Sequence, residues 1–128
     1  MAKTVKKQYV VFGLGRFGMS VAKALYESGA DVLAVDKNIE LVNEMDAFCT
    51  QSVCADATDE RVLQKLGINN FDVAVVCIGT QAESSIFITL MCKQLGVKYV
   101  VCKAQDKMHK TVLEKLGADR VIIPEEEM

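Results

Sequence analysis

The sequence predicts a doubly wound α/β fold of the Rossmann type, with a six-stranded parallel sheet and helices on both faces. Short β-branched runs alternate along the chain with longer amphipathic stretches. Strands that are apolar throughout are buried on both faces, and their alternation with helices indicates a parallel sheet. A glycine-rich turn directly after the first strand, GLGRFG at residues 13–18, is typical of this fold.

Each strand is expected where a short apolar run stands between polar or glycine-rich segments. These runs predict strands at residues 9–12, 32–35, 51–54, 73–78, 99–102 and 121–123. The amphipathic stretches between them predict helices at residues 17–27, 39–45, 61–66, 82–95 and 107–116. Thr58 or Asp59 is the expected N-cap of the third helix. Helices are expected to end at glycines that accept a left-handed conformation, namely Gly29, Gly67, Gly96 and Gly117.

The chain length fits one domain. Its 128 residues are enough for a real core, and 51% apolar with 25% charged residues is ordinary for a globular protein. We expect a solvated tail at residues 1–7 and one nucleotide-binding domain at residues 8–128, with no second domain after it. A net charge of −2 and the lack of a long basic stretch argue against a nucleic-acid partner.

The cysteines and the hydropathy pattern indicate a cytoplasmic protein. Five cysteines occur without a C-x-x-C pair, so we expect free thiols in a reducing compartment. No signal peptide is visible, and no apolar stretch approaches the ~18 residues that a membrane span needs. Any role at a membrane must therefore come through a partner.

The glycine loop predicts a phosphate site. Gly13 permits the tight turn, Gly15 lets the backbone approach a diphosphate, and Gly18 lets the helix pack close to the strand. Phosphates then lie at the positive end of the helix dipole, against free backbone N–H groups. The alternative is a glycine-rich turn that serves packing alone.

Asp36 is the expected ribose ligand. It ends the second strand, eighteen residues after Gly18. A carboxylate there accepts hydrogen bonds from the ribose hydroxyls and repels a 2′-phosphate, which disfavours NADP. The alternative is an N-cap for the following helix, although Asn38 is available for that role.

Other polar residues at the same edge have two interpretations each. Arg16 is either a phosphate ligand or a solvated surface arginine. Asp56 either reaches the adenine edge or caps the next helix. The pair Gly79-Thr80 and Lys103 follow the fourth and fifth strands, where ligands collect in this fold, and an ordinary surface role is equally open for them.

The residues favour binding over catalysis. A dehydrogenase needs a proton donor and a substrate pocket, which a second domain normally supplies. We expect His109 on the surface of a helix, with Asp106 as the cap of that helix. No G-K-[ST] follows the glycine loop, which argues against a P-loop phosphohydrolase. The rival hypotheses are a fragment of an NAD-dependent oxidoreductase and a redox sensor that binds NADH without chemistry.

Four segments carry a family resemblance: QYVVFGLGRFG at residues 8–18, VLAVD at 32–36, ADAT at 55–58 and VLEKLGADRVI at 112–122. In these segments the chain resembles the regulatory subunits of Trk/Ktr-type potassium uptake systems. The resemblance runs over residues 8–127, and the arginine inside the glycine loop makes it much more specific than the glycine pattern alone.

The resemblance implies an RCK (KTN) N-terminal domain, a cytoplasmic regulator of potassium conductance. Members of this family form dimers and then rings, commonly octamers, that dock beneath a membrane-embedded potassium pore subunit. ATP against ADP, or NADH against NAD, changes the ring shape and gates the pore. The family usually continues into a crossover helix and a C-terminal ligand-binding subdomain, which we expect this chain to lack.

The resemblance also implies roles for individual residues. Arg16 would contact the distal phosphates and Lys103 would flank them, while Asp36 would hold the ribose and Asp56 would face the adenine. Glu125 would lie near a dimer contact, where a neighbour's phosphates or a cation approach. The complete set of expected nucleotide-binding residues is Gly13, Leu14, Gly15, Arg16, Phe17, Gly18, Asp36, Lys37, Asp56, Ala57, Ile78, Gly79, Thr80, Lys103 and Glu125.

The helix expected at residues 82–95 is unusually apolar. One apolar stripe suffices for packing on a sheet, and the surplus predicts a subunit interface. The alternative is deeper burial within the chain. The apolar residues concerned are Ala82, Ile86, Phe87, Ile88, Leu90, Met91, Cys92 and Leu95.

Overall fold

Six parallel strands form one sheet in the computed structural model of the chain, which describes residues 6–79 and 81–124. Their order across the sheet is β3-β2-β1-β4-β5-β6. Phe12 at the end of β1 pairs with Val35 of β2 on one side and with Val76 of β4 on the other. The predicted fold class is therefore confirmed. The strands are β1 (Gln8–Phe12), β2 (Asp31–Asp36), β3 (Gln51–Cys54), β4 (Val73–Val76), β5 (Tyr99–Lys103) and β6 (Arg120–Ile122).

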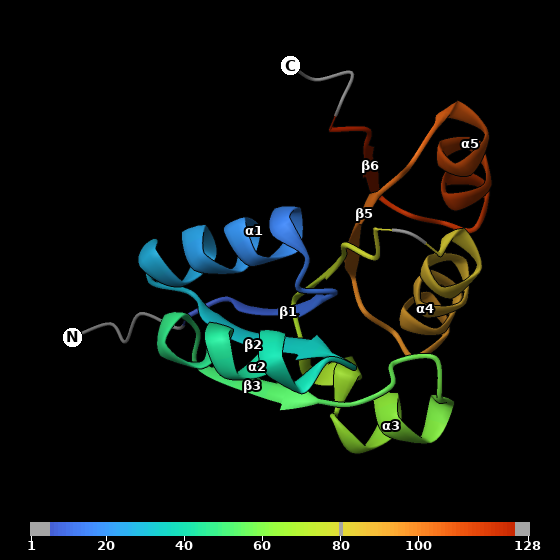
Figure 1. Cartoon of the computed structure of the whole chain (residues 1–128). Helices are drawn as coiled ribbons and strands as arrows, with labels where there is room; N and C mark the ends of the chain where they lie inside the picture. The colour runs from blue at the N-terminus through green and yellow to red at the C-terminus, as the bar shows by residue number, and fades with distance from the viewer. Residues whose placement is uncertain (1–5, 80, 125–128) are drawn as a thin grey trace.

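Helices cover both faces of the sheet (Figure 1). They are α1 (Arg16–Glu27), α2 (Ile39–Met45), α3 (Glu60–Lys65), α4 (Ala82–Gln94) and α5 (Lys107–Lys115). Ala22 of α1 and Val42 of α2 belong to one buried cluster, and Leu63 of α3, Ile88 of α4 and Leu113 of α5 belong to another. Each face thus has its own core, as right-handed crossovers on a parallel sheet require.

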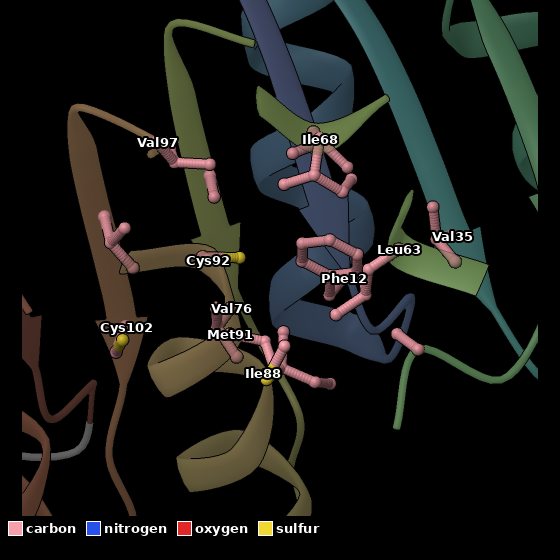
Figure 2. Packing of buried hydrophobic residues seen from close by; sticks show 14 of the residues in the cluster. Phe12, Val35, Leu63, Ile68, Val76, Ile88, Met91, Cys92, Val97 and Cys102 are labelled. Carbon is pink, nitrogen blue, oxygen red and sulfur yellow. The ribbon is translucent and has the colours of Figure 1, made fainter. Parts of the chain in front are cut away.

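The second core is the larger one (Figure 2). Phe12 of β1 and Val76 of β4 project from the sheet toward Leu63 and Ile88, and all four side chains are almost fully buried. Because β1 and β4 are central strands, their residues face protein on both sides. This explains why their sequences are apolar without alternation.

The expected elements all exist, and most differences lie at their ends. The strand expected at residues 73–78 ends at Val76 because its neighbour β1 ends at Phe12. The carbonyl of Phe12 accepts a last bond from the Cys77 amide at 2.7 Å, and Gly13 then leaves the sheet. Two short 3₁₀ turns, Asp46–Phe48 and Ile68–Asn70, were not predicted. Neither carries enough residues for a periodic pattern.

The crevice of a doubly wound sheet forms where successive connections leave in opposite directions. In this chain that point lies between β1 and β4, because the connection after β1 leads toward β2 and the one after β4 leads toward β5. Figure 1 shows the first turn of α1 and the segment after β4 meeting there. The topology therefore brings the glycine loop, the end of β2 and residues 77–79 to one edge.

Helix α4 lies between α3 and α5 (Figure 1). Ile86, Phe87 and Leu95 are half-buried against the larger core, and Ile88 and Met91 are buried. Packing within the chain therefore accounts for most of the apolar surplus, which weakens the case for a subunit interface along this helix. No helix within residues 6–79 and 81–124 has both the length and the apolar character that crossing a bilayer demands.

The expectation that His109 is an ordinary surface residue is wrong. Its side chain is 5% exposed, because α5 turns it toward α4, where Ser85 Oγ lies 2.7 Å from Nε2. Burial lowers the pKa of His109, and the nearby Asp106 carboxylate opposes that shift. Asp106 is the N-cap of α5, as predicted, and accepts a bond from the His109 amide at 2.8 Å.

This burial makes stability depend on pH. The unfolded chain takes up a proton on His109 near the ordinary value of about 6.5, whereas the fold favours the neutral ring. The unfolded state therefore binds more protons, and the free energy of unfolding should fall as the pH drops from about 6.5 through the lower native pKa. Urea unfolding at a series of pH values measures this slope. A His109→Gln variant should lose it, and an equal slope in both proteins would contradict the assignment.

Candidate functional site

A pocket of about 370 Å³ opens at the carboxyl edge of the sheet, over the ends of β1, β2 and β4. It is lined by eight of the residues predicted from the sequence. Those residues are Gly13, Gly15, Asp36, Lys37, Asp56, Ala57, Ile78 and Gly79. Segments up to 66 positions apart in sequence thus meet at the place that the topology dictates for a ligand.

Two of the three loop glycines are required by the fold itself. Gly13 has a φ of +93°, and a Cβ there would stand 2.8 Å from the Cys77 carbonyl oxygen. A Cβ on Gly18 would collide with the Gly13 carbonyl. These absences of side chains let α1 approach β1 and β4 closely.

Gly15 differs from the other two. Apart from its chain neighbours, no atom of the described residues lies within 4 Å of the position that its Cβ would occupy, and its backbone conformation is open to any residue. Packing does not explain a glycine here. The residue leaves backbone exposed at the mouth of the pocket, where a ligand can approach it closely.

The first turn of α1 carries free amide hydrogens. No side chain caps this helix at Gly15, and none caps α4 at Gln81. By contrast, Asn38, Asp59 and Asp106 cap α2, α3 and α5 with side-chain oxygens. Helices α1 and α4 both begin beside the pocket, and without a side-chain cap at Gly15 or Gln81 their positive ends are available to an anion.

Asp36 links β2 to the glycine loop. Its Oδ2 accepts a bond from the Leu14 amide at 2.7 Å, and its Oδ1 accepts one from the Asn38 amide at 2.8 Å. The alternative role, N-cap of α2, belongs to Asn38, whose side chain accepts from the Glu40 amide. Two backbone donors therefore fix the carboxylate at the rim, and each oxygen retains a lone pair for a hydroxyl.

Asp56 does not cap the following helix. Its Oδ1 accepts bonds from both the amide and the hydroxyl of Thr58, while Asp59 caps α3. The Thr58 hydroxyl and amide hold the pKa of Asp56 below its ordinary value, with a smaller contribution from Lys37. Asp56 is therefore ionised at neutral pH, beside Ala57 on the wall of the pocket.

Several predicted residues lie next to the pocket rather than in it. Leu14 buries its side chain, and only its backbone faces the rim. Arg16 is exposed over an adjoining hollow that it shares with Gly15 and Lys23. Gly18 is buried beneath the loop. Thr80 and Glu125 are outside the described residues.

Phe17 and Lys103 meet on the other side of Gly79. The Lys103 ammonium lies 5.9 Å from the centre of the Phe17 ring, within cation–π range. It also lies 3.4 Å from where a Gly79 Cβ would stand. The same two side chains reach a separate apolar groove of about 660 Å³, which runs along β4 and β5 beside α1. Lys103 therefore extends the positive charge beyond the predicted pocket.

Sequence reasoning missed four polar residues. Thr58, which it considered only as a helix cap, lines the pocket together with Gln81 and Ser84 at the start of α4. Gln105 holds the wall from behind, because its side-chain amide donates to the Gly79 carbonyl at 2.8 Å. Helices on a parallel sheet begin at its carboxyl edge, and this general rule would have indicated Gln81 and Ser84. Nothing in the sequence pattern indicates Gln105.

Comparison with known proteins gives a family match over most of the chain. The TrkA-N domain model matches residues 9–124. The Ktr system potassium uptake proteins C and A of Bacillus subtilis are each 46% identical to the chain, over 124 and 128 residues. The alignments cover 97% and 100% of this chain but 56% and 58% of the two relatives. The chain thus spans little more than half the length of these curated relatives.

Solved structures show the same fold at low sequence identity. The GsuK channel bound to NAD superimposes with a TM-score of 0.79 and 15% identity, over 95% of this chain and 22% of the channel chain. GsuK bound to ADP gives a TM-score of 0.78 and 15% identity, over 92% and 31% of the two chains.

The glycine geometry predicts unequal effects on stability for the same substitution at two positions. Gly18→Ala should destabilise the fold by about 3 kcal/mol or more, because the added methyl group meets a backbone carbonyl that cannot move aside. Gly15→Ala should change stability by less than about 1 kcal/mol, because its methyl group enters open space. Thermal unfolding measures both effects. Equal losses at the two positions would refute the distinction between packing and site glycines.

Proposed function

The chain belongs to the TrkA-N domain family, and we propose that it is a regulatory domain of a potassium uptake system that binds an adenine nucleotide between β1 and β4. The observation that carries this proposal is the placement of Asp36. Two backbone amides fix its carboxylate at the rim, directly beside the uncapped start of α1. A fixed acceptor for a sugar diol next to a bare anion site matches a nucleoside diphosphate.

Each part of the nucleotide has a candidate partner. Amides of the first turn of α1 would bind the diphosphate, since Gly15 leaves them accessible. Asp36 would accept bonds from the ribose hydroxyls. Asp56 and Ala57, on the wall beyond Asp36, would face the adenine. All of these groups belong to the adenosine diphosphate portion, so the proposal covers ATP, ADP, NAD and NADH.

The distal group of the ligand would be distinguished by cations at the pocket margins. Arg16, exposed at the start of α1, would contact the terminal phosphate of ATP. Lys103 lies on the far side of Gly79 and would add positive charge there. A ligand shifts a conformational equilibrium only through its different affinity for the two states. The contact of Arg16 with a phosphate that ADP lacks would supply such a difference.

We propose that the nucleotide is sensed rather than consumed. The two Bacillus relatives are named as potassium uptake proteins, and GsuK, a channel, is known with NAD and with ADP bound. The chain would act at the cytoplasmic side of a membrane, through a pore subunit that conducts potassium. Assembly into dimers and then an octameric ring would convert a change in each domain into a force on the pore. Glu125 would lie near the dimer contact.

The primary experiment identifies the ligand. Native mass spectrometry of the purified chain should detect a retained adenine nucleotide, and calorimetry should rank ATP, ADP, NAD and NADH. Lack of binding by all four at millimolar concentration, with well-folded protein, would refute the proposal. Turnover of NADH with any acceptor would favour an oxidoreductase instead.

Asp36→Asn should weaken every adenosine ligand. Loss of the charged acceptor for the ribose hydroxyls should raise the Kd about 10- to 100-fold, while the amide oxygen still accepts the Leu14 bond and the bond from the Asn38 amide is lost. Asp59→Asn is the matched control, because it makes the same chemical change at a helix cap outside the pocket, where asparagine caps equally well. Calorimetry with ADP should show full affinity in the control. Full affinity in Asp36→Asn as well would remove Asp36 from the site.

Arg16→Ala should affect ATP more than ADP. The guanidinium is expected to contact the terminal phosphate that ADP lacks. The ratio of the Kd for ADP to the Kd for ATP should therefore fall toward one in the variant. Arg61→Ala is the control, since Arg61 pairs with Asp59 at the start of α3, outside the pocket. Competition titrations of ATP against ADP measure the ratio. An equal loss for both nucleotides would exclude Arg16 as the residue that distinguishes them.

A further inference from the structure

His109 is the only histidine of the chain, and its two ring nitrogens have different partners. The backbone amide of Gln105 donates to Nδ1 at 3.1 Å. On the opposite edge of the ring, Nε2 lies 2.7 Å from Ser85 Oγ. Ser85 is fully buried. One ring therefore bridges the segment before α5 and the first turns of α4.

These partners require a neutral ring. Nδ1 receives a hydrogen from Gln105, so it carries none of its own, and the ring hydrogen is on Nε2. Nε2 donates it to Ser85 Oγ, and the Ser85 hydroxyl donates in turn to the Ala82 carbonyl at 3.0 Å. Each hydrogen of this chain of bonds, from the Gln105 amide through the ring and Ser85 to the Ala82 carbonyl, thus has one acceptor. A second proton on the ring has no acceptor among these groups.

Both segments that His109 joins form a wall of the pocket. On the Nδ1 side, the Gln105 side chain holds the Gly79 carbonyl at 2.8 Å, and Gly79 lines the pocket. On the Nε2 side, Ser85 belongs to the same helical turn as Ser84, which also lines it. The position of this wall therefore depends on both bonds of the ring.

We propose that His109 is a positioning residue that couples nucleotide binding to its own protonation. A proton on Nδ1 sets its N–H against the N–H of Gln105, which breaks that bond and frees the Gly79 carbonyl. The wall then loosens, and nucleotide affinity falls as the pH falls. The inference rests on the proposed function, because it assumes that this pocket binds the nucleotide.

The charges around the ring are consistent with a switch below neutral pH. Burial lowers the pKa of His109, and Asp106 is the charged group in the described structure that raises it. The other titratable or charged side chains on the packed elements are not among the causes of this shift. They are Glu83, Cys92 and Lys93 on α4, Tyr99, Cys102 and Lys103 on β5, Lys107, Lys110, Glu114 and Lys115 on α5, and Arg120 on β6.

The test compares NAD binding at about pH 7.5 with binding about one pH unit below the pKa of the His109 ring in the free protein, which NMR supplies first, because burial puts that pKa below the ordinary histidine value. NAD is the probe because both ends of its diphosphate are esterified, whereas a terminal phosphate itself titrates near pH ~6. The Kd should rise at least about fivefold at the lower pH, the lower range of typical coupling between sites. An unchanged Kd would overturn the proposal.

His109→Gln is the matched control. Its side-chain amide retains a donor for Ser85 but takes up no proton, so the ratio of the two Kd values should be near one. If ADP binds and NAD does not, the pH dependence of ADP binding to His109→Gln gives the effect of phosphate titration alone. The wild type must then lose more affinity for ADP at the lower pH than this variant does. An identical pH dependence in the two proteins would refute the proposal.

A titration of the wild type alone provides an independent test. NMR of the single histidine ring should give a lower pKa when the protein is saturated with nucleotide. The ratio of the acid dissociation constants with and without nucleotide should equal the ratio of the nucleotide Kd values for the protonated and neutral protein. Identical titration curves with and without nucleotide would overturn the inference while leaving the proposed function intact. Absence of binding at either pH would instead refute the proposed function, and this inference with it.

Discussion

The contact between α1 and the turn that precedes it is the constraint on which the site depends. Gly18 lies so close to the Gly13 carbonyl that only hydrogen fits between them. This contact fixes the start of α1 beside β4 and leaves the Leu14 amide facing Asp36. One steric condition therefore places the free amides and orients the carboxylate that lies beside them. The glycine pattern is a packing requirement before it is a binding motif.

The pocket wall on the β4 side is held differently. The bond from the Cys77 amide to Phe12 is the last one that ties this segment to β1. Gly79 and the start of α4 are therefore positioned by hydrogen bonds from outside the sheet. Gln105 and His109 supply those bonds. The glycine-loop side is thus fixed by sterics that do not vary with conditions. The opposite side is fixed by polar contacts, which respond to protonation.

Apolar periodicity and the glycine spacing were sufficient for the fold class, all six strands and the place of Gly13, Gly15 and Asp36, because these signals are local in the sequence. Ala57 and Ile78 entered through the family resemblance, and they line the same pocket. The sequence did not reveal the burial of His109, because nothing in the pattern of a helix indicates which neighbouring helix a histidine faces. The extent of the 73–78 strand was overestimated for a similar reason. Its end is set by Phe12 on another strand, more than 60 positions away. Contacts between distant segments decided each of these points.

The five thiols are unequal in a way that offers an experimental handle. Four are buried, and burial raises the pKa of Cys77 and Cys92 to about 12 and that of Cys102 to about 11. Cys54 alone is exposed, at the end of β3 next to the strand that carries Asp36. A maleimide dye would therefore attach there selectively without mutagenesis. Its emission would report on the rim of the pocket in the otherwise native chain.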